Sequence, residues 1–487
     1  MNTAVRAAAA SVLLFGCVRN PATGKLQLDI VSESQEVEMG KQAAQEVQQT
    51  MGTYKDPKVE AYVNNLGQSL AKQTTRPNLP WQFHVVEDAS VNAFALPGGP
   101  VFVTRGILGT LNSEAELAGV MGHECGHVAA RHSATQLSKA QVAQLGLGLG
   151  SILSPAVASV GQVAGAGLQV MFLKFSRDDE SQADKLGLAY MANDGYDARS
   201  MLEVFRTLNR VSKLAGGGKL PQWLETHPDP ENRLGVAEQR LKEIKHDFTG
   251  AKVNREDYLR TIDGIVYGED PRQGFFKGQL FLHPELKFQV QFPEGWKTQN
   301  TPQAVAAISP KQDAIVQLQA AGQGTSPEQA AQKFFSQKGI QRGQAAQTSV
   351  HGLPAVAAYF AAQTDQGQIG GLVTFLGYNN TTWAILGYTA AAAVQQHDAE
   401  FKSVTTSFGP LTDAAAANVQ PAKIQLVKLD QPMTVEQFQQ KYPSNLKVEE
   451  VALINGLDAP ASPMQPGQTY KRVVGGPPHD QQKQAAR

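Results

Sequence analysis

The chain has little cysteine, little net charge and no long uninterrupted apolar run. Only Cys17 and Cys125 occur in 487 residues, so a disulfide-stapled fold is excluded. The formal net charge of −1 gives no strong field for nucleic acid or for acidic partners, and we expect no nucleic-acid partner. No apolar stretch approaches the roughly 18 residues of a membrane-spanning helix. The length is sufficient for two or three hydrophobic cores.

What the chain has instead is the motif His123-Glu124-Cys125-Gly126-His127. On an α-helix, a four-residue step brings both imidazoles to the same face, one turn apart. This spacing suits two ligands of one tetrahedral metal, usually zinc, and Glu124 lies close enough to act as a general base on a metal-bound water. Ser113 and Glu116 form a capping-box pattern that predicts the start of this helix. The alternative is a core helix with two incidentally stacked histidines.

A third protein ligand should lie downstream. The extended histidine pattern requires glycine at position 130 and histidine at 133, where the chain has Ala130 and Ser133. His132 is displaced by one residue, and we interpret it as a residue behind the ligands or on the surface. A separate helix offers Glu180 as a metal ligand and Asp184, four residues later on the same face, as acceptor of a ligand histidine's second ring N–H. A solvated acidic helix face is the alternative interpretation of this segment.

Together these motifs resemble those of the CAAX-endopeptidase and HtpX-like zinc metallopeptidases, which are gluzincins, with a glutamate as third ligand. The resemblance runs from about Asn20 to Leu241. Besides the histidine motif, it includes Asn20-Pro21-x-Thr23-Gly24-Lys25, Val91 to Gly99, Ser176-Arg177-x-x-Glu180-x-x-Ala183-Asp184, and Thr226-His227-Pro228 with Arg233 after it. The resemblance implies one Zn2+ held by His123, His127 and Glu180. It also implies polypeptide substrates, which in this family are misassembled envelope proteins.

His227 lies in a His-Pro turn, whose rigidity suits a group that must be positioned. In the family, the matching histidine is placed at the active site, where it would stabilise the oxyanion of the tetrahedral intermediate. His227 would alternatively occupy a fourth ligand position in a self-inhibited resting state, because catalytic zinc takes three protein ligands plus water. A surface turn is the third possibility. Arg233 is expected to anchor this loop through an acidic residue near the site.

The segment Asn92-Ala93-Phe94 is predicted to begin a strand. It resembles the edge strand of thermolysin-like enzymes, to which an extended substrate adds itself through main-chain hydrogen bonds. An ordinary inner strand is the alternative. Between the zinc helix and Glu180, Leu145 to Leu173 is rich in small and apolar residues. This segment is either a mobile hairpin beside the site or a packed helical pair.

The N-terminus predicts export. Arg6 precedes a short apolar run, Ala7 to Phe15, with the shape of a secretory signal. The run ends in Leu14-Phe15-Gly16-Cys17, which resembles the lipobox of bacterial lipoproteins. The resemblance implies lipidation of Cys17, a membrane tether on the periplasmic side and, because Val18 follows, sorting to the outer membrane. A soluble periplasmic protein released from its signal is the alternative.

We predict an α+β protein with a mainly helical protease domain that contains a small antiparallel sheet. The segment after the linker resembles a degenerate LysM domain, a small β-α-α-β carbohydrate binder, which implies peptidoglycan binding. An equally open alternative is that this segment is a vestigial unit that only packs against the rest of the chain. The expected order is a signal at 1–17, the protease domain at 20–250, an α+β accessory domain at 275–410, an Ala-rich linker at 411–423, the LysM-like segment at 424–474 and a disordered tail at 475–487.

The predicted function is zinc-dependent hydrolysis of peptide bonds in the bacterial cell envelope, with Glu124 as general base. One alternative is an envelope chaperone or scaffold in which the metal holds the fold. The presence of a base beside the ligands argues against it, because a structural site needs none. A cell-wall peptide hydrolase is the other alternative, and it draws on the LysM-like segment.

Overall fold

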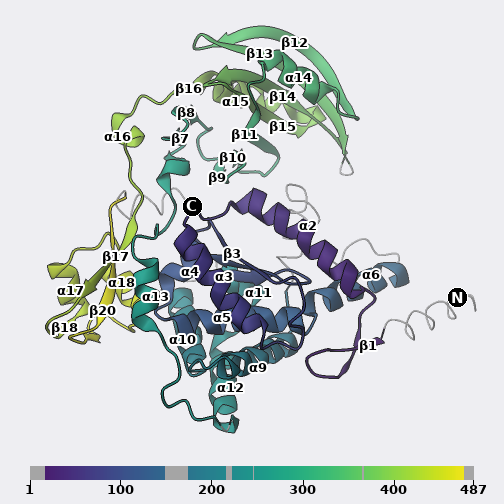
Figure 1. The fold of residues 1–487 in the computed structure, drawn as a ribbon. Coiled ribbons are helices and arrows are strands. Elements are labelled where there is room, and N and C mark those ends of the chain that lie inside the picture. Colours follow the sequence, from purple (N-terminus) through teal and green to yellow (C-terminus); the bar gives the residue numbers. More distant parts are fainter. Residues whose placement is uncertain (1–16, 148–173, 215–221, 245, 365–366, 477–487) are drawn as a thin grey trace, which may run out of the picture. The chain divides into compact units, whose positions relative to one another are not determined.

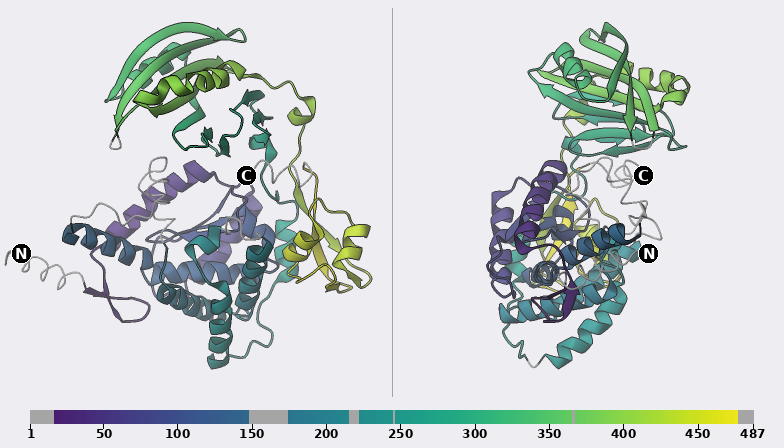
Figure 2. Two further views of the ribbon diagram at one scale, coloured as in Figure 1. Left: turned by 180° about the vertical axis from the view of Figure 1, so that it is seen from behind. Right: turned by 90° about the vertical axis from the view of Figure 1, so that its right-hand side faces the viewer.

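The computed structural model describes residues 17–147, 174–214, 222–244, 246–364 and 367–476. The signal-like residues 1–16, most of the apolar segment 145–173 and the tail from residue 477 lie outside the described residues. The chain divides into two compact units, which we describe separately (Figures 1 and 2). The first unit comprises the residues up to Gly268 together with Lys423–Val474, and the second comprises Glu269–Ala422 with the residues after Val474.

The first unit begins with a short hairpin and two capped helices. Strand β1 (Cys17–Arg19) pairs antiparallel with β2 (Leu26–Leu28). Ser32 and Gln35 form the capping box of α2 (Glu33–Met51), as the sequence predicts. The Asp56 side chain accepts two backbone N–H groups at the start of α3 (Pro57–Ala71).

The small sheet of the first unit is mixed, so the prediction of an antiparallel sheet was wrong. Its strands β3 (Gln82–Val86), β4 (Ala93–Ala95) and β5 (Pro100–Thr104) lie in the order β3-β5-β4. Strands β4 and β5 are antiparallel because a turn at Gly98 and Gly99, both with positive φ, reverses the chain. Strands β3 and β4 lie on opposite sides of β5, so the chain crosses from one side to the other between them. As a result β3 runs parallel to β5.

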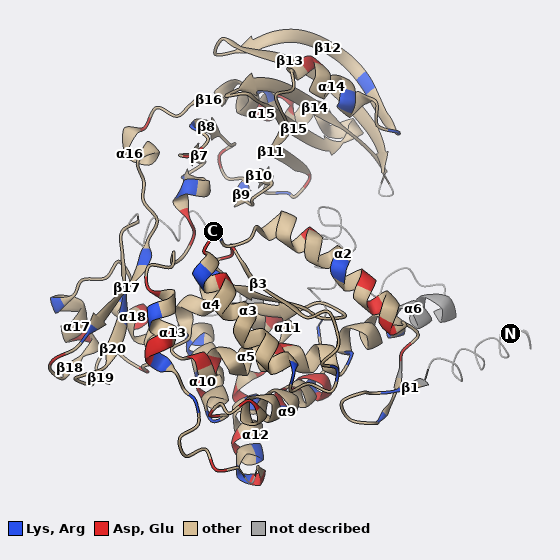
Figure 3. Ribbon diagram, in the orientation of Figure 1, with Lys and Arg blue, Asp and Glu red and all other residues tan. Residues whose placement is uncertain are grey.

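Helix α5 (Glu114–Ala129) runs through the middle of the first unit and is buried at every position from Ala115 onwards. Its backbone lies very close to that of α9 (Arg177–Asn193), because glycines of the two helices meet where they cross. A Cβ atom added to Gly187 would lie only 2.9 Å from the backbone nitrogen of His123. The other helices of this part are α4 (Arg105–Thr110), α6 (His132–Leu147), α10 (Ser200–Leu214), α11 (Gln222–Thr226), α12 (Pro230–Glu243) and α13 (Arg255–Ile262). The helices of this unit carry charges of both signs (Figure 3). No helix among the described residues is long and apolar enough to cross a membrane.

Residues 423–474 form six short elements in the order strand, strand, helix, helix, strand, strand, and their resemblance to a LysM domain stays a prediction. The elements are β17 (Lys423–Lys428), β18 (Met433–Thr434), α17 (Val435–Lys441), α18 (Val448–Ile454), β19 (Pro463–Met464) and β20 (Thr469–Val474), with β17 antiparallel to β20. Lys471 on β20 is fully buried and donates hydrogen bonds to the carbonyls of Gly109, Thr110 and Leu111 at distances of 3.0, 3.3 and 2.6 Å. The segment is therefore packed against the residues that lead into α5.

The second unit is built on an antiparallel sheet of seven strands in the order β12-β13-β14-β15-β11-β10-β9. A four-stranded sheet, β16-β8-β7-β6, lies beside it. The strands are β6 (Phe275–Lys277), β7 (Leu280–His283), β8 (Phe288–Gln291), β9 (Lys297–Asn300), β10 (Ala304–Ile308), β11 (Ala314–Gln323), β12 (Ile340–Val350), β13 (Leu353–Thr364), β14 (Gly367–Tyr378), β15 (Thr381–Ala390) and β16 (Gly409–Pro410).

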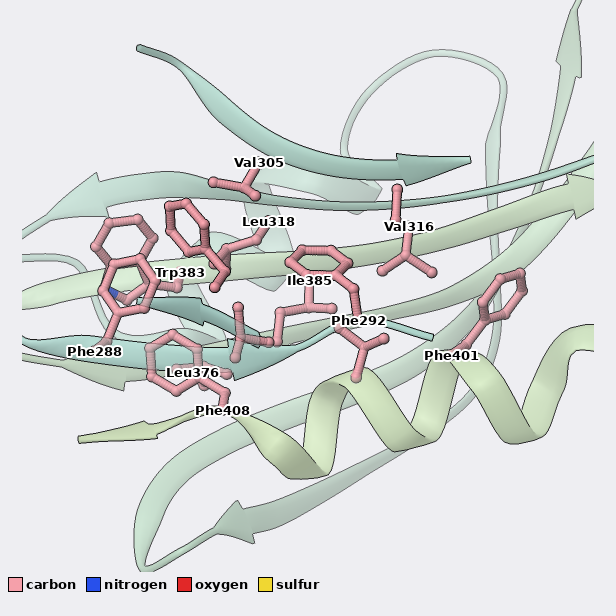
Figure 4. Packing of buried hydrophobic residues seen from close by; sticks show 14 of the residues in the cluster. Phe288, Phe292, Val305, Val316, Leu318, Leu376, Trp383, Ile385, Phe401 and Phe408 are labelled. Carbon is pink, nitrogen blue, oxygen red and sulfur yellow. The ribbon is translucent and has the colours of Figure 1, made fainter. Parts of the chain in front are cut away.

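Two helices cover opposite faces of the large sheet. Because side chains alternate along a strand, Val373 of β14 packs into the cluster that includes residues of α14 (Pro327–Phe335), while Leu372 packs into the other cluster. That second cluster joins the sheet to α15 (Val394–Ser407) through Phe401, and to β8 through Phe288 (Figure 4). The two clusters give this unit a hydrophobic core of its own.

Candidate metal centre

Four buried side chains from three parts of the first unit converge on one point. Helix α5 presents His123 and His127, whose Nε2 atoms are 3.0 Å apart. Helix α9 brings Glu180, with carboxylate oxygens 3.6 Å from His123 Nε2 and 3.4 Å from His127 Nε2. His227 follows α11, and its Nδ1 lies 2.8 Å from Glu180 Oε1 and 3.3 Å from His123 Nε2. One donor atom from each of the four residues lies within 4.8 Å of the others, so together they can hold a metal ion.

The chemistry of these donors fits a metal ion. Burial lowers the pKa of His123 to about 3, so this imidazole is neutral near pH 7, as a metal ligand must be. Burial opposes the ionisation of Glu180, but its electrostatic interactions with His227 and Arg233 hold its pKa well below the usual value. Imidazole nitrogens and one carboxylate oxygen are donors that zinc accepts in a tetrahedral arrangement.

Asp184 and Arg233 form the support behind His123. Asp184 Oδ1 lies 2.9 Å from His123 Nδ1, so the ring proton on Nδ1 points to the carboxylate and Nε2 faces the other donors. Arg233 donates to both carboxylate oxygens of Asp184, at 2.6 and 2.9 Å, and its Nη1 lies 2.9 Å from Glu180. Burial alone would raise the pKa of Asp184, but Arg233 beside it lowers this pKa to about 2. Arg233 lies on α12 and thus connects the helix that follows His227 to α9.

His132 lies behind His127 and not on the surface. Its Nδ1 is 2.9 Å from His127 Nδ1, and its Nε2 is 2.8 Å from the side-chain oxygen of Gln182. Burial lowers the pKa of His132 to about 4, so the ring is neutral near pH 7. A neutral His132 can accept the proton on His127 Nδ1, which leaves His127 Nε2 free to bind metal. Only the fold reveals Gln182 as a partner, because it belongs to a different helix.

Glu124 lies beside the four donors without being one of them. The side chain is 1% exposed, and its Oε1 is 3.7 Å from His227 Nε2. Among the described residues, this oxygen has no hydrogen-bond partner. Burial raises the pKa of Glu124 to about 8. A cation held by the four donors would oppose this shift and favour the ionised carboxylate, which could then take a proton from a nearby water molecule.

Two aromatic side chains that the sequence did not single out enclose His227. The rings of Trp223 and Phe175 have centroids 4.8 and 5.9 Å from that of His227, and Phe175 lies 4.1 Å from His127. The Arg233 guanidinium lies 4.8 Å from the Trp223 ring. These aromatic walls lower the local polarity around the donors. No sequence signal could have identified Trp223, because an aromatic residue in a short helix is most often an ordinary core residue.

The predicted substrate strand lies at the edge of its sheet. Among the described strands, β4 pairs only with β5. Ala93 is fully buried, and the side chain of Phe94 stacks on Phe102 with centroids 5.2 Å apart, so these side chains belong to the core. The backbone of Asn92 is bonded to Thr104 in both directions, at 3.1 Å each. Contact between this strand and a substrate stays a prediction, as does lipidation of Cys17 at the start of β1.

The geometry is that of a metallopeptidase in which one helix supplies a His-Glu-x-x-His pair and a second helix supplies a glutamate. Residues 57–241 match Peptidase family M48. The chain is similar to the beta-barrel assembly-enhancing protease of Yersinia pestis, with 30% identity over 49% of this chain and 50% of that protein. The protein of the same name from Escherichia coli K12 is 28% identical over 46% of this chain and 47% of its own length. The mitochondrial metalloendopeptidase OMA1 of Arabidopsis thaliana is 36% identical over 33% of this chain and 32% of that protein. The chain thus spans about half the length, or less, of these curated relatives.

Proposed function

We propose that the chain is a zinc-dependent endopeptidase of the bacterial cell envelope that cleaves misfolded or misassembled proteins. The buried cluster of His123, His127, Glu180 and His227, with Glu124 beside it, carries this proposal. A site that only held the fold together would have no need of a buried carboxylate next to its ligands. The similarity to proteases named for β-barrel assembly supports the choice of substrate class.

The proposed mechanism assigns each residue one task. His123, His127 and Glu180 would hold the zinc, which when bound would supply a Lewis acid that makes water more acidic and polarises a carbonyl. Glu124 accepts the proton of the attacking water and then delivers it to the departing amine. Asp184 keeps the proton of His123 on Nδ1, away from the metal side.

We further propose that the structure represents a resting state in which His227 occupies the fourth ligand position. Its Nδ1 lies among the three other donors, and its ring is 2% exposed. For a peptide carbonyl to reach the metal, the His227 side chain would have to move aside, and it would then be free to donate a hydrogen bond to the developing oxyanion. The sequence suggested two roles for His227, as a fourth ligand and as an oxyanion stabiliser. The same side chain would then fulfil each role in a different position.

A His227→Ala variant separates these two tasks. If the histidine only blocks the site, casein hydrolysis rises. If it only stabilises the oxyanion, kcat falls by about 100-fold, the cost of losing one such donor. A residue with both tasks lowers kcat for short peptides and also lowers the zinc affinity measured by competition with a chromogenic chelator. An unchanged zinc affinity would contradict the resting-state proposal.

The endopeptidase proposal is tested with Glu124→Gln. We expect the variant to retain one zinc per chain, because residue 124 is not a ligand, and to lose casein hydrolysis by at least about 100-fold, because the base is gone. Glu38→Gln on α2 is the matched control, since Glu38 is exposed and remote in sequence from the site. Equal casein hydrolysis by the wild type and Glu124→Gln would refute the proposed mechanism, and the chaperone interpretation would take its place.

We also propose a periplasmic location, with an outer-membrane anchor on Cys17 and peptidoglycan binding by residues 424–474. The lipobox-like residues before Cys17 support the anchor, and the order of strands and helices supports the LysM resemblance. Labelling of cells with radioactive palmitate should mark the wild type and leave Cys17→Ala unlabelled. Co-sedimentation with purified peptidoglycan tests glycan binding, and protein left in the supernatant would count against it.

A further inference from the structure

Strand β12 leaves one edge of the seven-stranded sheet open. Among the described strands, β13 is its only partner. It is eleven residues long and largely exposed, and Arg342 is its single charged residue. The opposite edge strand, β9, is four residues long and begins with Lys297. Short length and lysine are common protections of sheet edges against pairing with other chains, and β12 has neither. Its one protective feature is the irregular register between Arg342 and Ala345.

The hairpin geometry shows which backbone groups of β12 are free to pair. Val350 faces Leu353 across the two-residue turn His351-Gly352, in which both residues have positive φ. The closing pair of such a hairpin exchanges both of its hydrogen bonds, and the bonded pairs then alternate along the ladder. Thr348 therefore bonds towards β13, whereas Gln347 and Ser349 direct their N–H and C=O groups away from the sheet. The residue opposite Ser349 is a proline, Pro354, which fits a position without an inward bond.

An open groove runs beside this strand on the face of the sheet that α14 covers. Its volume is about 720 Å³, and its walls come from α14 and from β12. The half-buried Phe335 contributes most of the apolar surface, on the helix side, whereas Ala331 and Val356 line the groove but are almost fully buried. The Arg342 guanidinium lies 5.4 Å from the Phe335 ring. Gln347 faces Val356 across the ladder and therefore points its side chain towards the groove.

We propose that β12 and this groove bind an extended segment of client polypeptide, which adds to the sheet as an eighth strand. The outward N–H and C=O groups of β12 would pair with the main chain of the client and so accept many sequences. Every second client side chain would face the groove, where the exposed part of the Phe335 ring favours an apolar residue. The groove should have little preference for the charge of the client, because Glu328 and Arg342 place opposite charges in its walls. The ligand class is an extended, nearly neutral segment with alternating apolar and polar residues. Only the description of this ligand as a client of proteolysis rests on the proposed function.

The test uses the full chain with Glu124→Gln, so that a bound peptide is not cleaved. The probe is a fluorescein-labelled ten-residue peptide of alternating valine and threonine, followed by fluorescence anisotropy. Gln347→Pro removes one outward N–H and leaves the bonds to β13 intact, since proline is tolerated at such edge positions. We expect it to weaken binding by about tenfold or more. Gln347→Ala is the matched control, because it removes the side chain and keeps the N–H, and it should bind within about twofold of the parent.

Three further measurements keep the proposal falsifiable. Gln347→Lys, which introduces a charge without changing the backbone, should also weaken binding, and an unchanged melting temperature shows that the variants remain folded. Equal affinities of Gln347→Pro and Gln347→Ala would overturn the proposal, as would equal binding of a peptide with proline at every second position. A parent chain that forms dimers which Gln347→Pro abolishes would identify a second copy as the occupant and overturn it too. If the Glu124→Gln parent bound no probe peptide while the wild type still cleaved short peptides, this proposal alone would be refuted. Peptide binding by the parent without any Glu124-dependent cleavage by the wild type would refute only the proposed function.

Discussion

Asp184 offers a sharp test of how the candidate centre is supported. The carboxylate accepts two hydrogen bonds from Arg233, at 2.6 and 2.9 Å, and lies 2.9 Å from His123 Nδ1. An Asp184→Asn substitution keeps the shape of the side chain and one acceptor oxygen but removes the negative charge. It leaves the buried Arg233 with Glu180 as its remaining anionic contact at short range.

The magnitude follows from the pKa of Asp184. The folded-state value of about 2 lies below the ordinary 3.8, which corresponds to about 2.5 kcal/mol of stabilisation of the ionised form. This stabilisation is fully present above pH 3.8 and is lost as the pH falls through about 2. Because the substitution also breaks a buried ion pair, we expect a loss of about 3–5 kcal/mol in the free energy of unfolding at pH 7. Zinc affinity should fall by about 10- to 100-fold, as is usual when the partner of a ligand histidine is changed.

The assays are denaturant unfolding of the zinc-loaded protein and zinc competition with a chelator. Asp178→Asn is the matched control, because Asp178 lies on the same helix and is exposed. The unfolding free energy of Asp184→Asn should also depend less on pH between about 4 and 2 than that of the wild type. If Asp184→Asn matched Asp178→Asn in both stability and zinc affinity, Asp184 would have no part in orienting His123.

Two further predictions concern buried groups that are not among the four donors. Lys471→Met should lower the free energy of unfolding by about 1–3 kcal/mol, because the buried carbonyls of residues 109–111 lose their hydrogen-bond donor. The exposed Lys428→Met is the control, and equal melting temperatures of the two variants would contradict the packing of β20. Burial raises the pKa of the Cys125 thiol, so in a Cys17→Ser background the native enzyme should not react with iodoacetamide until it is unfolded, as measured by mass spectrometry.

Local signals in the sequence predicted the secondary structure around the site well. The capping pairs at Ser32 and Ser113 start α2 and α5, where the side-chain oxygens accept the predicted backbone N–H groups. The direction of β3 was not predictable in this way. Whether a strand runs parallel or antiparallel depends on which side of β5 the chain crosses, and the periodicity of a strand carries no information about its neighbour.

The sequence by itself determined that His123 and His127 share one face of a helix, because their four-residue spacing fixes both rings on one face of any helix they form. It also determined that Glu180 and Asp184 share a face of another helix. Only the tertiary structure decided that the glycine-rich crossing of α5 and α9 brings these two faces together. It likewise placed His227 among the donors and Lys471 against the residues before α5. The physical reason is that helical spacing is a local property, whereas these contacts join residues far apart in the sequence and form only when the whole core packs.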